Sequence, residues 1–175
     1  MKKILILDEF FHNADDLRTI ALSTSFNDAR KISYDVGWRG FRTNEIRGFN
    51  NNVLNDCCQK IRNHLSNFFN YDINEDDYMS ANFYFHIALS ETKNTLLNFD
   101  VNKFHTDDAT YAGIVYLSPN PPSETGTSII IENQINDVEN KYNRLVAYPS
   151  DYVHAPTDLF GSSIETGRLT LSFFI

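Results

Sequence analysis

Two histidines and an aspartate in the C-terminal half constrain the fold more than any other feature of this sequence. His105 and Asp107 are two residues apart, so in an extended strand their side chains project to one face while Thr106 points to the other. His154 lies far along the chain and reaches the same point only from another strand, which a closed β-structure allows. Two imidazoles and one carboxylate are the ligand set of a non-haem iron(II) site with open coordination positions.

The predicted helices precede most of the predicted strands. A short strand at 3–7 is followed by a helix that begins after Asn13, a good N-cap residue, and by a second helix at about 52–69. The acidic run at 74–77 is typical of a solvated connection, and a strand follows at about 79–89. Turn residues then separate short strands at about 103–107, 111–117, 127–132, 144–149 and 168–174. This order predicts an α+β domain.

In its C-terminal half the sequence resembles the iron(II)- and 2-oxoglutarate-dependent dioxygenases. In that family an H-x-D motif, a distal histidine and a basic residue followed by x-Ser/Thr occur in this order. Here the three elements are His105-Thr106-Asp107, His154 and Arg168-Leu169-Thr170. The turn at 126–127 and the segment at 144–150 also match, whereas the N-terminal half is only loosely similar.

The resemblance implies a fold and a set of roles. The fold is a double-stranded β-helix, the jelly-roll core of the family, within an α+β domain. His105, Asp107 and His154 are the implied ligands of Fe(II). Arg168 and Thr170 are the implied partners of the distal carboxylate of 2-oxoglutarate, which binds as co-substrate together with O2. Tyr84 is the candidate for a further hydrogen bond to the co-substrate.

The last predicted strand supports the role of Arg168 without the family. Arg168, Thr170 and Ser172 share one face of this strand, and Leu169, Leu171 and Phe173 share the other. An arginine and two hydroxyls on the inward face of a small barrel are costly without a polar partner, and a dicarboxylate supplies one. The alternative is an exposed polar face on an edge strand.

The strand at 79–89 has a polar and an apolar face. Asn82, Tyr84 and His86 alternate with the aromatic and aliphatic residues Phe83, Phe85 and Ile87. His86 is the one rival metal ligand, but no Asp or Glu lies two residues from it. We therefore predict that His86 is a structural residue of the barrel wall.

The segment at 34–43 is rich in aromatic residues and arginine and is broken by glycines. It is predicted either to anchor an irregular loop on the core through its tryptophan or to form a lid that contacts substrate. In the second case the substrate-facing candidates are Trp38, Arg39 and Arg42. Loops at 34–48 and 86–103 are then expected to determine the substrate.

The composition limits the expected binding partners and the expected cellular compartment. The formal net charge is -8 and no run of Lys or Arg occurs, so nucleic acid is not an expected partner. The adjacent residues Cys57 and Cys58 suit reduced thiols, and the apolar run at 4–7 is too short for a signal segment or a membrane span. We therefore expect a cytoplasmic protein without a membrane anchor.

Taken together, these features predict one oxygenase domain over residues 1–175. Residues 1–80 are expected to form a helical cover and lid, and residues 81–175 the β-helix core. The predicted activity is hydroxylation of a peptide side chain or a small metabolite, with release of succinate and CO2. The H-x-D motif, together with the segments at 116–118 and 126–127, resembles the prolyl-hydroxylase branch most. The alternative is a metal-binding jelly-roll module without catalysis.

Overall fold

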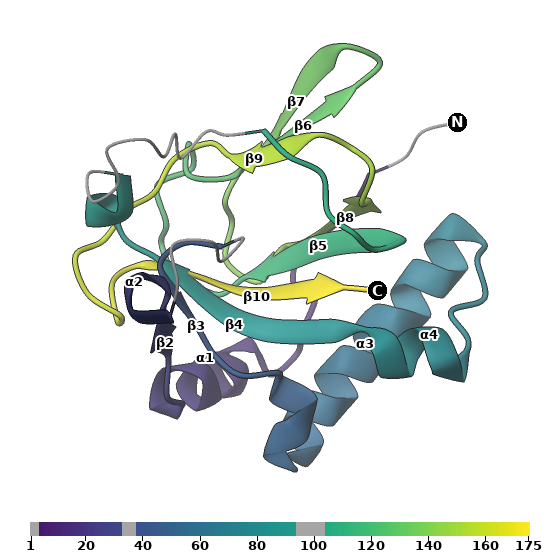
Figure 1. The fold of residues 1–175 in the computed structure, drawn as a ribbon, viewed down its shortest axis with the longest axis horizontal. Helices are drawn as coiled ribbons and strands as arrows, with labels where there is room; N and C mark the ends of the chain where they lie inside the picture. Colours follow the sequence, from purple (N-terminus) through teal and green to yellow (C-terminus); the bar gives the residue numbers. More distant parts are fainter. Residues whose placement is uncertain (1–3, 33–37, 94–103) are drawn as a thin grey trace.

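Two antiparallel β-sheets and a layer of helices make up the computed structural model, which describes residues 4–32, 38–93 and 104–175 (Figure 1). The larger sheet has the strand order β1-β8-β5-β10-β4-β3-β2 and the smaller sheet the order β7-β6-β9. The strands are β1 (Leu5–Leu7), β2 (Asn27–Asp28), β3 (Phe41–Arg42), β4 (Asn82–Ala88), β5 (Tyr111–Tyr116), β6 (Thr127–Ile131), β7 (Gln134–Val138), β8 (Leu145–Pro149), β9 (His154–Pro156) and β10 (Arg168–Phe174). The mixture of helices with antiparallel sheets agrees with the α+β prediction.

Helices cover the outer face of the larger sheet (Figure 1). They are α1 (Ala14–Ser23), α3 (Asn52–Phe69) and α4 (Glu75–Ser80). The other helical elements are the short α2 (Ala29–Ile32) and the 3-10 turns η1 (Ile46–Phe49) and η2 (Ser90–Lys93). Helix α3 has the predicted bounds, and the side chain of its N-cap Asn51 accepts hydrogen bonds from the N–H groups of Val53 and Leu54. No helix in the described part of the chain combines the length and the apolar character needed to cross a bilayer.

Side chains alternate along β4 and β10, so that one face of these strands packs in the core and the other faces the cavity. Phe83, Phe85 and Ile87 of β4 are fully buried on the helical side, as the period-two pattern predicts. They join the residues of α1 and α3 in one cluster, which includes Leu17, Leu54, Ile61, Leu65, Leu171 and Phe173. The opposite face of the same strands, with His86 and Thr170 in register, is turned toward the smaller sheet.

Three local predictions differ from the structure. The acidic run at 74–77 opens helix α4, because the Asn74 side chain and the Asp77 carboxylate cap its first turn reciprocally. The predicted strand at 103–107 is reduced, within its described residues 104–107, to a single bridge between His105 and His154. Strand β7 was not predicted, because four of its five residues are exposed and the segment has no apolar alternation; it pairs with β6 along its whole length.

Candidate functional site

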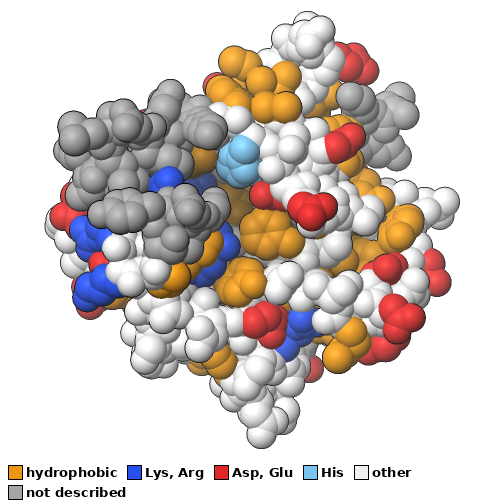
Figure 2. All heavy atoms as spheres, in the orientation of Figure 1, with side chains coloured by type: hydrophobic (Ala, Val, Ile, Leu, Met, Phe, Trp, Pro, Cys, Tyr) orange, Lys and Arg blue, Asp and Glu red, His pale blue; other side chains and the backbone are white. Residues whose placement is uncertain are grey.

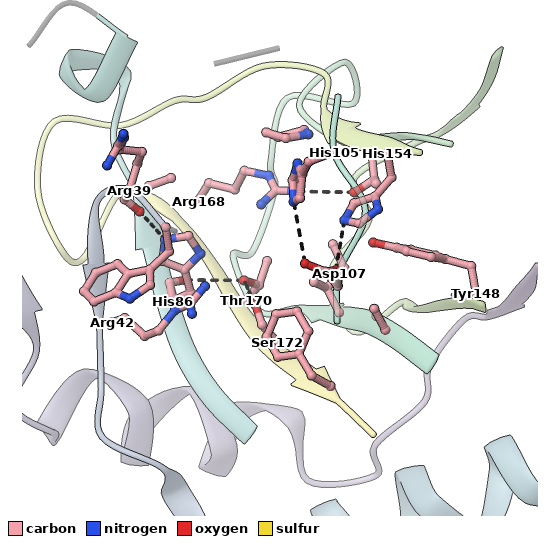
Figure 3. A pocket seen from close by; sticks show the side chains of 18 of the residues that line it. Arg39, Arg42, His86, His105, Asp107, Tyr148, His154, Arg168, Thr170 and Ser172 are labelled. Atoms are coloured by element: carbon pink, nitrogen blue, oxygen red, sulfur yellow. Dashed lines mark hydrogen bonds and ion pairs between the residues drawn. The ribbon is translucent and has the colours of Figure 1, made fainter. Parts of the chain in front are cut away.

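The three predicted metal ligands come together between the two sheets (Figure 3). His105 and Asp107 precede β5, and His154 begins β9. Reciprocal backbone hydrogen bonds of 3.0 and 2.9 Å join His105 to His154, and the Asp107 N–H donates to the Ser150 carbonyl at 3.0 Å. The backbone therefore fixes both segments before any ion binds.

Distances within this triad suit one metal ion. Asp107 Oδ2 lies 3.3 Å from His154 Nε2, and Asp107 Oδ1 lies 3.7 Å from His105 Nε2. Ligand atoms of all three residues lie within 4.8 Å of one another. Two ligands about 2.1 Å from an ion and at right angles are roughly 3 Å apart, so a small inward movement allows all three to coordinate it.

The tautomer of His154 strengthens the case for a cation. Its Nδ1 lies 2.9 Å from the Tyr152 carbonyl, which can only accept, so Nδ1 carries the proton. In the neutral ring Nε2 then presents a lone pair to the Asp107 carboxylate. Two electron-rich atoms facing each other repel unless a cation or a proton lies between them. The residues present thus fit a divalent metal ion.

Tyr148 packs against this triad. Its ring centroid lies 4.8 Å from that of His154, and the side chain is 3% exposed. Burial, and secondarily the negative charge of Asp107, raise the pKa of the Tyr148 hydroxyl well above its ordinary value. The hydroxyl is therefore neutral, and Figure 3 shows it pointing toward the Asp107–His154 side of the cavity.

A cavity of about 610 Å³ extends from the triad across the inner face of the larger sheet. This volume lies within the range of about 300–1,000 Å³ common for small-molecule sites. Both sheets line it, through residues such as Ala112, Ile114 and Thr170 of the larger and Thr127 and Pro156 of the smaller.

Arg168 lies in the wall of this cavity and is 6% exposed. Its Nε donates to the Thr125 carbonyl at 2.8 Å and its Nη2 to the Gly126 carbonyl at 3.0 Å. The guanidinium carbon lies 5.3 Å from the ring centroid of Tyr116. Burial lowers the pKa of Arg168, and no carboxylate among the described residues forms an ion pair with it. A buried cation held by neutral groups is a receptor for an anion.

Comparison with solved structures decides the fold. No family model matches the sequence, and no curated protein matches it. A prolyl-4-hydroxylase from Pseudomonas putida is 16% identical, with 99% of this chain and 92% of that chain covered, at a TM-score of 0.59. The protein has the prolyl-hydroxylase fold.

Two further structures agree with this assignment of the fold. A prolyl hydroxylase from Trichoplax adhaerens, in complex with a hypoxia inducible factor peptide fragment, is 13% identical over 99% of this chain and 83% of that chain, at a TM-score of 0.59. HygX from Streptomyces hygroscopicus, with nickel and 2-oxoglutarate bound, is 12% identical over 98% and 82%, at a TM-score of 0.56. The resemblance seen in the sequence is thus confirmed at the level of the fold, and the His-Asp-His triad agrees with it.

Within this prolyl-hydroxylase fold, the polar face of β10 is part of the cavity wall. β10 lies between β5 and β4, so the alternative of an exposed edge strand is wrong. Thr170 and Ser172 are 1% and 5% exposed, and their hydroxyl oxygens are 3.2 Å apart. Both residues line the same cavity as Arg168, as the alternation predicted.

Tyr84 is not among the residues that line the cavity. It shares the inner face of the sheet with His86, and its hydroxyl donates to Asn82 Oδ1 at 3.0 Å. A hydrogen bond from Tyr84 to the co-substrate therefore stays a prediction. Two other tyrosines contact site residues: the Tyr148 ring packs against His154, and the Tyr116 ring lies beside the Arg168 guanidinium.

All three substrate candidates of the segment at 34–43 line the cavity, whereas residues 34–37 of that segment lie outside the described part. Trp38 packs its ring edge-on against His86, at 6.2 Å between centroids. Arg42 lies over the Trp38 ring at 4.9 Å, and burial lowers its pKa to about 10, so it stays charged at neutral pH. Trp38 therefore packs against the sheet, as the anchoring alternative predicts, and also lines the cavity.

His86 is separate from the metal triad, as predicted. Its Nε2–H donates to the Arg39 carbonyl, and it belongs to no metal-binding cluster among the described residues. Burial, assisted by the charge of Arg42, lowers the pKa of His86 to about 3. The ring is thus neutral and forms part of the wall.

We expect His86 to make the stability of the protein depend on pH. The unfolded ring takes up a proton near pH 6.5 and the folded ring only near pH 3. The free energy of unfolding therefore falls as the pH drops from 6.5 toward 3, by at most about 1.4 kcal/mol per pH unit from this group. Urea titrations at pH 7 and 4.5 should show a smaller loss for His86→Gln than for wild type. His12→Gln is the control, because His12 is exposed; this variant should lose as much free energy of unfolding as wild type. Equal losses for wild type and His86→Gln would contradict the expectation.

Proposed function

We propose that the protein is an iron(II)- and 2-oxoglutarate-dependent oxygenase that hydroxylates a peptide side chain or a small metabolite. One observation carries this proposal: His154 Nε2, which faces the Asp107 carboxylate at 3.3 Å, shares a cavity with the buried cation Arg168. The His154–Asp107 pair suits a metal ion, and the Arg168 guanidinium suits an anion. A co-substrate that chelates the metal at one end and carries a carboxylate at the other satisfies both.

The proposed fold is a double-stranded β-helix, with the two sheets as its two faces and residues 1–175 as one functional unit. The fold of HygX, whose structure holds nickel and 2-oxoglutarate, supports the assignment of the ligands. The Trichoplax enzyme holds a peptide fragment, which supports a peptide as one class of substrate. His105, Asp107 and His154 would hold the metal, and Arg168 with Thr170 the co-substrate.

When bound, iron(II) with 2-oxoglutarate and oxygen supplies the oxidising chemistry, which yields succinate, CO2 and a substrate in which one C–H has become C–OH. The residues of the chain orient the co-substrate. Arg168 binds the distal carboxylate through a planar guanidinium that the Thr125 and Gly126 carbonyls already hold in place. A side chain at Gly126 would meet the Val138 carbonyl at 1.8 Å, so only glycine brings its own carbonyl to this point.

Other residues of the chain keep the site ordered and dry. The Tyr152 carbonyl holds the His154 proton on Nδ1, which leaves Nε2 free for the metal. Tyr148 covers His154 with a ring that stays neutral. Apolar side chains such as Ile114, Leu159 and Phe174 line the remaining wall and exclude water from the oxidised carbon.

Oxygen-dependent conversion of 2-oxoglutarate to succinate tests the proposal. We expect the wild-type protein with Fe(II) to form succinate slowly even without substrate, and faster when a peptide or metabolite from a screen fits the cavity. A non-catalytic metal-binding module would bind Ni(II) with normal affinity and form no succinate above the rate without protein. That result would contradict the proposed activity while leaving the metal site intact.

A further inference from the structure

Arg42 is a second cation that lines the cavity, half-buried and separate from the one assigned to 2-oxoglutarate. It lies on β3, in register with His86 of β4, which is in register with Thr170 of β10. Arg168 lies two residues from Thr170 and is in register with Ala88 instead. Figure 3 shows the two guanidinium groups on different parts of the wall, with Arg42 across the Thr170–Ser172 face from the triad.

Aromatic rings hold the Arg42 guanidinium in place. Its central carbon lies 4.9 Å from the Trp38 ring, 5.1 Å from the Tyr84 ring and 5.9 Å from the Phe174 ring. Cation–π contacts of this kind fix the plane of the group without using its hydrogen-bond donors. The N–H donors of Arg42 are thus held in position before any ligand binds.

No acceptor satisfies these donors within the described residues. The Nε of Arg42 is buried and has no hydrogen-bond partner, and Arg42 forms no ion pair with a described carboxylate. Other arginines of the chain pair with acids, namely Arg30 with Asp28, Arg47 with Glu45, Arg62 with Glu75 and Arg144 with Asp8. A buried donor on a charged group costs free energy until an acceptor binds.

The charge of the cavity contrasts with that of the whole protein. The chain has a formal net charge of -8, yet Arg39, Arg42 and Arg168 all line this cavity. Figure 2 shows Lys and Arg side chains gathered beside a histidine on this face of the molecule. Among the described residues, the acids that line the cavity are Asp107 and Asp108, and a metal on the triad offsets the charge of the first. The loaded site therefore favours an anionic substrate.

We propose that Arg42 binds a carboxylate of the substrate, so that the substrate is a carboxylate-bearing compound whose oxidised carbon lies between Arg42 and the triad. This rests on the proposed function, which places the oxidised carbon near the metal. A guanidinium clamped between ring faces presents its N–H groups in one plane, and a planar carboxylate matches that plane. The co-substrate leaves this position free, because Arg168 takes its distal carboxylate.

Matched ligand pairs test this on protein loaded with Zn(II) and saturated with 2-oxoglutarate. The probes are N-acetyl amino acids, each compared with its N-acetyl amide, together with doubly capped Asp and Glu compared with capped Asn and Gln. We expect calorimetry to show at least one carboxylate bound about tenfold or more tightly than its amide. The first set detects a free α-carboxylate and the second an acidic side chain of a peptide.

Variants then assign the preference to Arg42. In Arg42→Gln the carboxylate and its amide should bind equally, whereas Arg42→Lys should keep part of the preference. Arg30→Gln, which alters a surface arginine outside the cavity, should behave as wild type. The Arg42 Nε–H resonance, assigned by its loss in Arg42→Lys, should shift on adding the carboxylate and stay in place on adding the amide.

Three results would overturn the assignment. They are equal affinity for carboxylate and amide in every wild-type pair, an unchanged preference in Arg42→Gln, and a large loss of 2-oxoglutarate affinity in Arg42→Gln. The last result would place Arg42 in the co-substrate site. Failure of the proposed oxygenase activity is distinguishable from all three, because it appears as absence of succinate formation by the wild-type protein with Arg42 intact.

Discussion

The Asp107→Ala protein is expected to bind Ni(II) about a hundredfold or more weakly than wild type and to form no succinate. Asp107 supplies the negative charge of the triad, and its two oxygens lie 3.7 and 3.3 Å from the Nε2 atoms of His105 and His154. Without the carboxylate, two neutral imidazoles remain, one of them with a side chain that is 45% exposed. Titration calorimetry with Ni(II), followed by a succinate assay with Fe(II), measures both effects.

Asp108→Ala is the matched control for this experiment. Asp108 is the adjacent carboxylate, is exposed and lies outside the cluster of ligand atoms. Its variant should bind metal and form succinate within about twofold of wild type, since exposed charges contribute little. Normal turnover by Asp107→Ala, or an equal loss in Asp108→Ala, would contradict the assigned triad.

Arg168→Leu is expected to weaken 2-oxoglutarate binding by about 3 kcal/mol, which is about a hundredfold. The loss is large because the variant leaves a co-substrate carboxylate in a buried site without its cation. The Thr125 and Gly126 carbonyls, which now accept from Arg168 at 2.8 and 3.0 Å, lose their donor as well. Calorimetry of 2-oxoglutarate on the Ni(II)-loaded protein gives the change in affinity.

Arg168→Lys and Ni(II) binding separate this effect from misfolding. Lysine keeps the charge but cannot make two parallel hydrogen bonds, so the affinity should be intermediate. Both variants should still bind Ni(II) as wild type does, because the triad is on other segments. Unchanged 2-oxoglutarate affinity in a folded Arg168→Leu protein would remove Arg168 from the co-substrate site.

The parts of the fold that follow simple periodicity could be predicted from the sequence. Helix α3 has the bounds its apolar stripe indicates, and β4 buries Phe83, Phe85 and Ile87 as alternation requires. Strand β7 was missed, since its residues Gln134–Val138 are mostly exposed and carry no apolar pattern. The acidic run at 74–77 was misinterpreted as a connection, because a capping box and not an apolar stripe starts helix α4 there.

In the candidate site, too, some features could be predicted from residue types and others depend on how the chain packs. The spacing of His105 and Asp107 and the polar face of β10 could be recognised from residue types alone. The orientation of His154 could not, because the group that holds it is the backbone carbonyl of Tyr152, and every residue has one. Alternation placed Tyr84 on the inner face of the sheet but does not say how far along a strand the cavity reaches, and Tyr84 is not among the lining residues.

We propose that the triad and Arg168 form one site that couples a metal to 2-oxoglutarate. The most direct measurement is the stoichiometry of 2-oxoglutarate consumption and succinate formation by the wild-type protein, with Fe(II) or O2 omitted in turn. We expect equal amounts of 2-oxoglutarate consumed and succinate formed, and almost none of either when Fe(II) or O2 is absent. Consumption that continues without metal, or no consumption by protein shown to hold both Fe(II) and 2-oxoglutarate, would contradict it.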